Sequence, residues 1–462
     1  MTLIDLTPIQ VGLAASFAGE LITPADPRYD EARMTWNAGM QKRPGLIAQA
    51  ATPEDVAAAV VFARAHELPV AVRGGGHSVA GHSTVEGGLV IDLSLMKQVS
   101  IDADRNIVRA GAGLLLGELD QETQRLGLAV PAGTVSHTGV AGLTLGGGLG
   151  WLMRRHGLTV DNLLAAQVVT AAGEIVDVSA DNHSDLFWAL RGGGGNFGVV
   201  TSFTYQAHPV GPIVTGGMFA FPFSRGAEVL TAVRTLIAEA SDDLTIFAVI
   251  ATAPPHDPFP VEFQGQPVVL IAVCHIGEGD SAAAELAPIR DLAPAADLVG
   301  PMPFAALQSM IDETAPHGRG NHSGAVQLPA LSDEVIGELL ATFASVTSPF
   351  AHIIIPTLGG AVARVAPDAT AFPHRSAPFM AWIVTEWLLE DEDRAEQHRS
   401  WVRTTRDALS RFGSGVYVNA LSDDPELLRH AYGTNLPRLR EIKRRWDPEN
   451  LFRLNANITP AP

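Results

Sequence analysis

Three glycine clusters in the first half of the chain constrain its fold more than any other feature. They read RGGGHSVAG at 73–81, LTLGGGLGW at 143–151 and LRGGGGNFGVVT at 190–201. Glycine inside regular structure costs about 0.5–1 kcal/mol relative to alanine, against a total stability of about 5–15 kcal/mol. Surface turns would explain one cluster but not three. Because backbone without side chains presents its N–H groups as a concave donor set, the clusters predict a large, phosphate-bearing cofactor.

Composition narrows the partners and the compartment. The 462 residues exceed the size at which a single core keeps growing, which predicts two domains. With a net charge of −19, the chain lacks the clustered Lys and Arg that nucleic acids and anionic membranes require, so we expect neither partner. The N-terminus MTLIDLTPIQ has no basic signal-peptide region, which favours a cytoplasmic protein. The single cysteine, Cys274, predicts a packed thiol, and we expect no disulfide and no metal.

The hydrophobic pattern changes near residue 216. Before it, Thr52 followed by Pro53 caps a helix that runs to about His66, 68–72 is a strand, and 163–179 contains a hairpin turning near 172–173. After it, long strand patterns at 219–223, 245–252 and 267–277 are interleaved with amphipathic helical patterns at 224–240 and 332–346. This order predicts an α+β second domain, with an antiparallel sheet flanked by helices.

One familiar cofactor pattern does not hold. The stretch NIVRAGAGLLLGELDQ has the outline of a strand, a glycine turn and a helix, but its glycines at 111, 113 and 117 are spaced one residue too widely for a dinucleotide fingerprint. No acidic residue ends the following strand either. We therefore do not expect a Rossmann domain.

Several motifs together resemble one flavoprotein family. RGGGHS, PAGTVSHTGVAGLTLGGGLGW, WALRGGGGNFGVVT, FPHR and the tail YVN…RLREIKRRWDPENLF resemble the berberine-bridge-enzyme-like branch of the vanillyl-alcohol-oxidase flavoproteins, in its bacterial form. The resemblance covers roughly 37–212 and 370–460. It implies an α+β fold with a two-subdomain, PCMH-type FAD-binding domain at 37–212 after an N-terminal extension at 1–36. A substrate domain at 213–405 and a C-terminal segment at 406–462, returning to the FAD domain, would follow.

The resemblance also implies how FAD is held. The histidine of the RGGGHS motif, His77, would be bonded through a ring nitrogen to the C8α methyl of the flavin; the alternative is a hydrogen bond to noncovalent FAD. Many relatives form a second link from a cysteine at the position of Val135, so one covalent link is expected here. The remaining FAD-binding positions implied are Arg73, Gly74, Gly75, Gly76, Ser78, Gly81, Gly133, Thr134, Val135, His137, Thr138, Gly139, Gly142, Gly146, Gly147, Gly148, Asp161, Asn162, Gly194, Asn196, Gly198, Val199, Val200, Tyr417, Asn419, Asn455 and Asn457.

The residues that would act on substrate follow less directly. Thr138 stands where the family gates oxygen toward the flavin, and its small hydroxyl side chain would permit oxidase chemistry. The tyrosine and glutamate bases of plant relatives align with Ala420 and Trp382, so those mechanisms are in doubt. Tyr417, Asn419, Trp382 and His322 remain as candidate catalytic residues. Alternation along a strand would point Tyr417 and Asn419 to one face.

The resemblance implies an FAD-dependent oxidase of secondary metabolism or catabolism. It would transfer a hydride from a small aromatic, heterocyclic or polyketide-like alcohol, amine or phenol to the flavin, with molecular oxygen as acceptor and hydrogen peroxide as product. The alternatives are a dehydrogenase with another acceptor, an oxygenase or oxidative cyclase on the same scaffold, and a non-catalytic flavin-binding protein. The substrate and oxygen are the expected partners of a monomer or homodimer.

Overall fold

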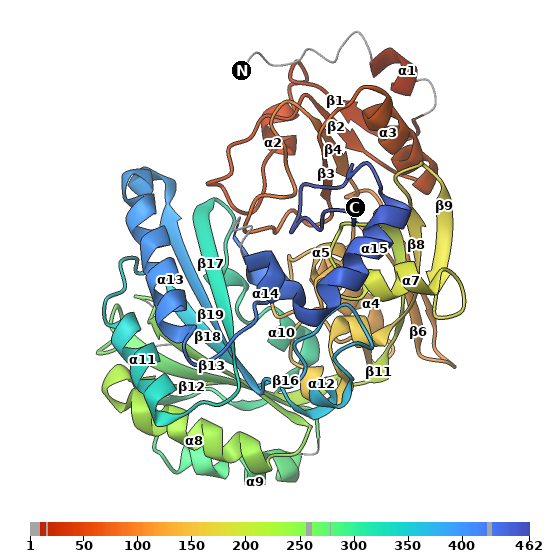
Figure 1. Cartoon of the computed structure of the whole chain (residues 1–462). Helices are drawn as coiled ribbons and strands as arrows, with labels where there is room; N and C mark the ends of the chain where they lie inside the picture. The colour runs from red at the N-terminus through yellow and green to blue at the C-terminus, as the bar shows by residue number, and fades with distance from the viewer. Residues whose placement is uncertain (1–9, 15–16, 256–260, 278, 423–426) are drawn as a thin grey trace.

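A computed structural model describes residues 10–14, 17–255, 261–277, 279–422 and 427–462. The chain is α+β, as predicted, with three smaller sheets formed before residue 210 and one eight-stranded sheet formed after it (Figure 1). The predicted boundary between 212 and 213 falls between the strands β11 (His208–Pro209) and β12 (Ile213–Pro222). No helix within the described ranges is long and apolar enough to cross a membrane.

The first sheet places the first glycine cluster at its edge. Its order is β1 (Glu20–Ile22), β2 (Leu46–Gln49), β4 (Leu89–Asp92) and β3 (Val70–Arg73), and β4 pairs in parallel with both β2 and β3. The predicted helix α3 (Pro53–Ala65) connects β2 to β3, and the Thr52 side chain caps it by accepting a hydrogen bond from Asp55 N at 3.2 Å. Because β3 ends at Arg73, the glycines at 74–76 leave the carboxyl end of a parallel strand, where α/β sheets bind ligands.

The second sheet is antiparallel and carries the third cluster. Its order is β5 (Val99–Asp102), β6 (Ile107–Gly111), β10 (Val199–Gln206), β8 (Leu163–Val169) and β9 (Ile175–Ser179). The strands β8 and β9 form the predicted hairpin around 172–173. Strand β10 begins directly after Gly198, so the glycines from 192 onward connect α7 (Ser184–Leu190) to the sheet centre. Since β6 pairs only with antiparallel neighbours, the glycines at 111–117 belong to no Rossmann unit.

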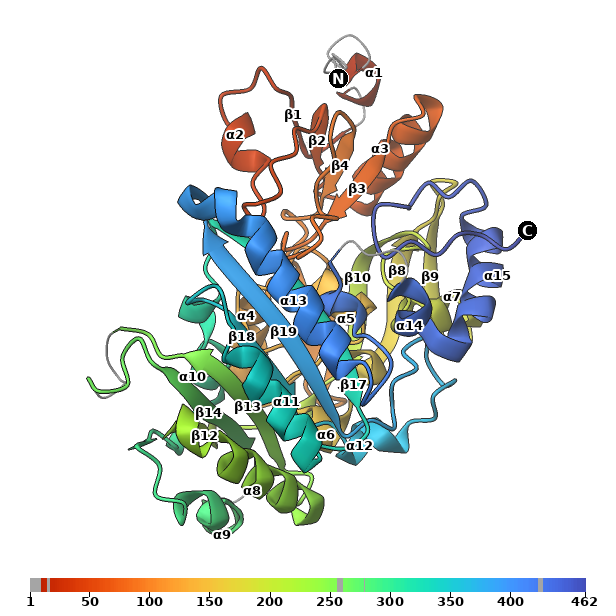
Figure 2. The same ribbon diagram turned by 60° about the vertical axis from the view of Figure 1, so that its left-hand side comes forward.

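The large sheet forms the other half of the molecule. Its main path runs β15 (Ala296–Asp297), β12, β14 (Pro267–His275), β13 (Leu244–Thr252), β18 (His352–Pro356), β19 (Phe379–Leu388) and β17 (Arg319–Leu328), while β16 (Gly300–Pro303) pairs with β12. The helices α8 (Gly226–Glu239), α9 (Gly279–Arg290), α11 (Asp333–Phe343) and α13 (Ala395–Leu409) cover one face (Figure 2). Cys274 is fully buried in β14, as predicted, and burial raises the pKa of its thiol.

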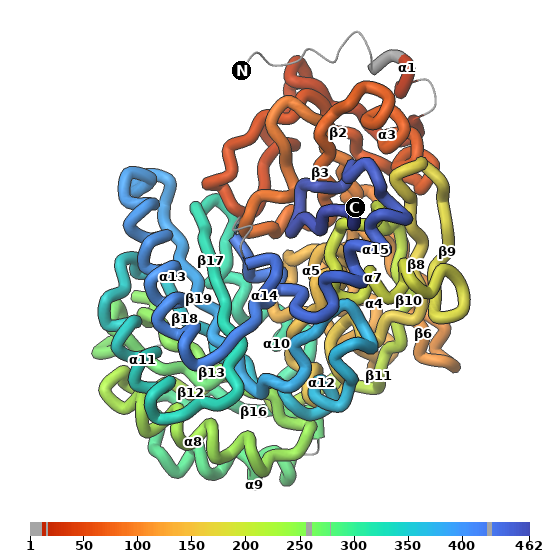
Figure 3. Tube along the Cα trace, viewed as in Figure 1, coloured from red at the N-terminus to blue at the C-terminus, as the bar shows by residue number. Residues whose placement is uncertain are grey.

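The C-terminal segment folds back onto the first half of the chain. It comprises η5 (Val418–Ala420), α14 (Leu428–Tyr432) and α15 (Leu436–Trp446), and the trace in Figure 3 shows it crossing beside α5 (Val140–Leu145) and α7. Buried Lys443 fixes it by donating to Asn196 O at 2.6 Å and pairing with Asp447 at 2.6 Å. The strand predicted around Tyr417 was wrong, because Ala420 N donates to Tyr417 O and closes a 3₁₀ turn instead.

A buried acid joins the two halves. Asp120 in α4 (Leu116–Gln124) accepts a hydrogen bond at 2.9 Å from Gln308 in α10 (Phe304–Gln308). Burial raises the pKa of Asp120 to about 7, and the Gln308 hydrogen bond lowers it only in part.

Asp120 makes stability depend on pH. The folded protein keeps this proton up to about pH 7, whereas an unfolded aspartate loses it near about pH 3.9. The raised pKa of Asp120 therefore stabilises the folded protein fully below about pH 4. As the pH rises through 7 this contribution is lost, and the free energy of unfolding falls by up to about 4 kcal/mol. Asp120→Asn should flatten the fall in melting temperature between pH 5 and pH 8. The exposed control Asp104→Asn should leave the fall unchanged, and an equal fall in Asp120→Asn would contradict the assignment.

Candidate active site

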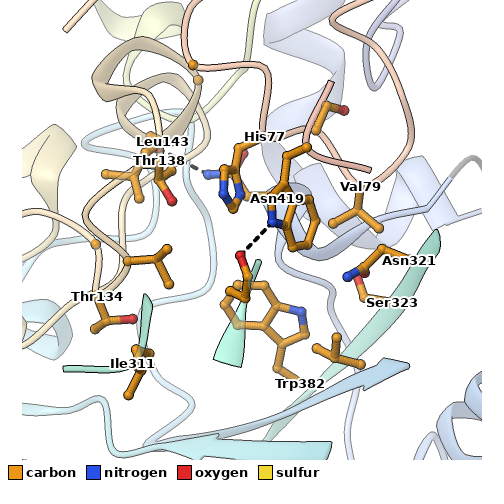
Figure 4. A pocket seen from close by; sticks show the side chains of 18 of the residues that line it. His77, Val79, Thr134, Thr138, Leu143, Ile311, Asn321, Ser323, Trp382 and Asn419 are labelled. Atoms are coloured by element: carbon orange, nitrogen blue, oxygen red, sulfur yellow. Dashed lines mark hydrogen bonds between the residues drawn. The ribbon is translucent and has the colours of Figure 1, made fainter. Parts of the chain in front are cut away.

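One large cavity lies between the glycine loops and the uncovered face of the large sheet. Its volume is about 1170 Å³. Figure 4 shows His77, Thr138, Asn419 and Trp382 around this space, with Asn321 and Ser323 on β17 at one side. The predicted residues that line it are Gly74, Gly75, Gly76, His77, Ser78, Gly133, Thr134, Val135, Thr138, Gly139, Gly142, Gly194, Gly198, Val199, Val200, Trp382, Tyr417, Asn419 and Asn455.

The glycines at 74–76 allow two loops to touch backbone to backbone. A Cβ atom on Gly75 would overlap the backbone of Gly139, and one on Gly139 would overlap Gly75. The loop that carries His77 is thereby pressed against the segment 133–139. The amides of residues 75–79 donate no hydrogen bond to any other described residue, which leaves them as a donor set for a ligand.

The His77 imidazole is held on one face and at one nitrogen. The Trp36 indole stacks on it with ring centroids 4.2 Å apart and an interplanar angle of 15°. Its Nε2 lies 2.9 Å from Nδ1 of His137. Burial lowers the pKa of His77 to about 3, with smaller contributions from His137 and His317. The ring is therefore neutral at physiological pH and has a nitrogen lone pair available for bonding.

Tyr417 and Asn419 reach the cavity together, although no strand holds them. The Tyr417 hydroxyl accepts hydrogen bonds from Asn419 Nδ2 at 3.0 Å and from Gly148 N at 3.3 Å, which leaves its own hydrogen to donate. Burial raises the pKa of this phenol, so it stays protonated. The Trp382 ring meets the Tyr417 ring edge-on at 5.8 Å. The Trp382 indole offers an aromatic ring beside the hydrogen-bonding groups of Tyr417 and Asn419.

The triple glycine at 146–148 makes close contacts with three side chains. A Cβ on Gly146 would overlap the Asn419 amide, one on Gly147 would lie 2.9 Å from Phe372, and one on Gly148 would overlap Thr159. These glycines do not line the cavity: Gly146 makes room for Asn419 of the returning C-terminal segment, while Gly147 and Gly148 make room for Phe372 and Thr159. They act on the site through Tyr417 and Asn419.

Other predicted residues lie behind the cavity wall, where several have structural partners. Arg73 pairs with Asp92 at 2.7 Å, and Asp161 pairs with the buried Arg375 at 2.7 Å. Asn196 ties down the C-terminal segment by accepting from Ile458 N at 2.9 Å. The predicted FAD positions that do not line the cavity are Arg73, Gly81, His137, Gly146, Gly147, Gly148, Asp161, Asn162, Asn196 and Asn457.

His322 is not brought to the cavity. Along β17, Arg319, Asn321 and Ser323 line it, so alternation points His322 to the opposite face. There it packs toward α13, where burial and then Arg403 lower its pKa to about 4. Of the RGNHSG motif, Asn321 therefore lines the cavity and His322 does not.

The sequence analysis missed an acidic group in the cavity. Glu386 lines it from β19, is 1% exposed and lies 2.9 Å from Arg319. Burial raises the pKa of Glu386 to about 7, and Arg319 opposes that rise. The alternation of Trp382, Val384 and Glu386 along one strand was the signal that would have found it. Trp36, which stacks on His77, had no comparable signal because it lies 41 positions earlier in the chain.

The cavity suits a bound dinucleotide together with a substrate. Its volume exceeds the about 300–1,000 Å³ typical of sites for drug-sized ligands. The free amides at 75–79 suit an anionic or hydroxylated chain, and the neutral His77 suits attachment of a ring. Within the described part of the chain, no cluster of three or more His, Cys, Asp or Glu side chains could hold a metal ion.

Comparisons with known proteins agree with this geometry. Residues 44–179 match the FAD binding domain family, and residues 416–459 match the family described as berberine and berberine like. The chain is 34% identical to an uncharacterized FAD-linked oxidoreductase of Bacillus subtilis, over 96% of this chain and 97% of that one. It is 30% identical to (R)-6-hydroxynicotine oxidase of Paenarthrobacter nicotinovorans, again over 96% of this chain and 97% of that one.

A solved structure supports the same relationship. The crystal structure of 6-hydroxy-D-nicotine oxidase from Arthrobacter nicotinovorans superposes with a TM-score of 0.86 at 29% identity, covering 96% of this chain and 99% of that one. Fold and cavity together define an FAD-linked oxidoreductase. The chain belongs to the berberine-bridge-enzyme-like family of these enzymes.

The close contact of the two loops predicts a glycine requirement. Gly75→Ala should force the loops apart, at a cost of about 1–3 kcal/mol for overpacking, and lower the flavin bound per purified chain. The control is Gly337→Ala in α11, where a Cβ meets nothing within 4 Å. This control should keep its flavin and gain up to about 1 kcal/mol of stability. Absorbance near the flavin maximum and the melting temperature measure both effects; full flavin content in Gly75→Ala would refute the requirement.

Proposed function

We propose that the chain is an FAD-dependent oxidase that removes a hydride from a small aromatic, heterocyclic or polyketide-like alcohol, amine or phenol. Oxygen is the acceptor and hydrogen peroxide the product. The observation that carries the proposal is the neutral, stacked His77 at one cavity in which Tyr417, Asn419 and Trp382 also converge. Membership of a family that includes (R)-6-hydroxynicotine oxidase supports it.

FAD, when bound, supplies the hydride acceptor. The chain's own residues then bind and orient the partners. His77 would anchor the flavin covalently through one ring nitrogen, and the free amides at 75–79 would bind its polar chain. Val135 stands where many relatives have a second linking cysteine, and because it offers no thiol it supports a single covalent link.

On the substrate side, polar groups lie in a mostly apolar wall. Tyr417 would donate its hydroxyl hydrogen to the group that develops charge, while Asn419 holds the Tyr417 oxygen in place. Glu386 would accept a substrate proton, because a carboxyl group with a pKa of about 7 changes its protonation state near neutral pH. The Arg319 guanidinium balances the charge of the Glu386 carboxylate before that carboxylate accepts the proton. Thr138 lies in the segment 133–139, and its small side chain would leave space for oxygen to approach the flavin.

The proposed link predicts that FAD survives denaturation. Wild-type protein precipitated with acid should keep one FAD per chain in the pellet, and the flavin-bearing peptide should contain His77. His77→Ala should release all of its flavin under the same treatment, because the only proposed attachment is gone. Intact mass spectrometry gives the same answer independently. Recovery of all the wild-type flavin in the supernatant would refute the covalent link.

The two sides of the site predict separable kinetic defects. Tyr417→Phe should slow reduction of the flavin by about 10²–10³-fold, since it removes one positioned donor. Thr138→Ile should instead slow reoxidation by oxygen, because the added bulk fills the approach of oxygen. A substrate is first sought by an anaerobic screen for bleaching of the flavin absorbance, in which 6-hydroxynicotine is the first compound tested. Stopped-flow spectroscopy with that substrate then measures the two half-reactions.

The effect of removing the Tyr417 hydroxyl needs a control variant that loses a different buried hydroxyl. Tyr205→Phe removes another buried hydroxyl, one that lies 2.7 Å from the Thr144 hydroxyl and outside the cavity wall. It should change neither half-reaction. If Tyr417→Phe loses flavin but reduces its remaining flavin at the wild-type rate, Tyr417 has only a structural role.

A further inference from the structure

Three histidines cluster between the cavity and the surface, with ring centroids 4.9 Å apart for His77 and His137 and 6.2 Å apart for His77 and His317. His77 lines the cavity, and its Nε2 lies 2.9 Å from His137 Nδ1. The His137 ring lies 5.1 Å from the ring of His317, which is exposed. His137 itself does not line the cavity. Its side chain therefore meets the cavity only through His77.

The rings of His77 and His137 are both held in place by the segment that follows α10. Asp312 accepts from Ser136 N at 2.8 Å and from Ser136 Oγ at 2.5 Å, which fixes the residue before His137. The Trp36 indole, which stacks on His77, donates to Ala315 O at 2.8 Å. The contact between His77 and His137 is therefore held from both sides by one stretch of chain. A chance contact between two mobile side chains would lack these supports.

Attachment of an imidazole to a carbon requires two things of the ring. One nitrogen needs a free lone pair, and the proton on the other nitrogen must leave once the bond has formed. With its hydrogen on Nε2 and donated to His137, His77 has its lone pair on Nδ1. The surroundings disfavour a charged ring, since burial lowers the pKa of His77 to about 3. The proton must therefore have an acceptor in contact with Nε2, and His137 Nδ1 is in that place.

We propose that His137 is a positioning residue for covalent attachment of the flavin: it orients His77 and accepts its ring proton, which leaves past His317 to solvent. The inference rests on the proposed link through His77. In that step a bond forms between His77 Nδ1 and the C8α carbon, and a C8α hydrogen and the imidazole N–H hydrogen leave as protons. The two electrons released enter the isoalloxazine ring and pass to dioxygen, which becomes hydrogen peroxide.

The test measures attachment rather than turnover. Full-length protein made under riboflavin limitation is loaded with FAD, and the fraction of flavin that resists acid precipitation is followed over time. His137→Leu should bind FAD as tightly as the wild type, measured by quenching of flavin fluorescence, but attach it about 10²-fold or more slowly. Added imidazole should restore part of the rate, because it replaces the missing proton acceptor.

Two further variants separate orientation from proton transfer. His137→Asn places an amide oxygen near the former Nδ1, so it should orient His77 without taking a full proton and give an intermediate rate. His66→Ala removes an exposed histidine that contacts Phe62 and should attach FAD at the wild-type rate. Should the leucine variant fail to fold, the attachment rate of the asparagine variant, measured with and without added imidazole, still decides.

The outcomes are distinct from those of the proposed function. Wild-type attachment rates in both His137 variants would overturn the role of His137 while leaving the link and the oxidase proposal intact. Weaker FAD binding in His137→Leu, with unchanged attachment of the FAD that binds, would also overturn it. Absence of covalent flavin in the wild type would overturn both the link and this inference.

Discussion

The contact between the backbones of Gly75 and Gly139 is the constraint on which the rest of the site depends. Neither residue has space for a Cβ atom, because each would overlap the other's backbone. This contact brings together the end of a parallel strand and the loop before α5, which come from different sheets of the first half. His77, two residues beyond Gly75, and His137, two residues before Gly139, face each other as a result. The glycines thus position side chains that they do not themselves carry.

Local spacing predicted much of this structure. The Thr52 cap, the hairpin at 172–173 and the buried strand around Cys274 depend on neighbours in sequence, and they are confirmed. The cavity-lining loop from Gly74 to Ser78 was also found, because three glycines directly after a strand indicate backbone that closely approaches another group. The α+β class followed from the order of the elements.

Contacts between distant residues could not be predicted in the same way. Gly146 accommodates Asn419, which comes from 273 positions later in the chain, so the glycine signal was assigned to the cofactor instead. His322 failed for another reason: on a strand, an error of one residue reverses the face of the sheet. Glu386 was missed because a buried acid resembles an ordinary surface acid until its burial and its Arg319 partner are known.

The return of the C-terminal segment has a consequence for the order in which the enzyme matures. Tyr417 and Asn419 fill the space beside Gly146–Gly148, and Asp312 holds the loop before His137. A chain that ended before Tyr417 would have the glycine loops and the large sheet, but neither Tyr417 nor Asn419 in the cavity wall. Tyr417 and Asn419 are therefore among the last residues that the ribosome adds, so the cavity lining is complete only after nearly the whole chain has been made.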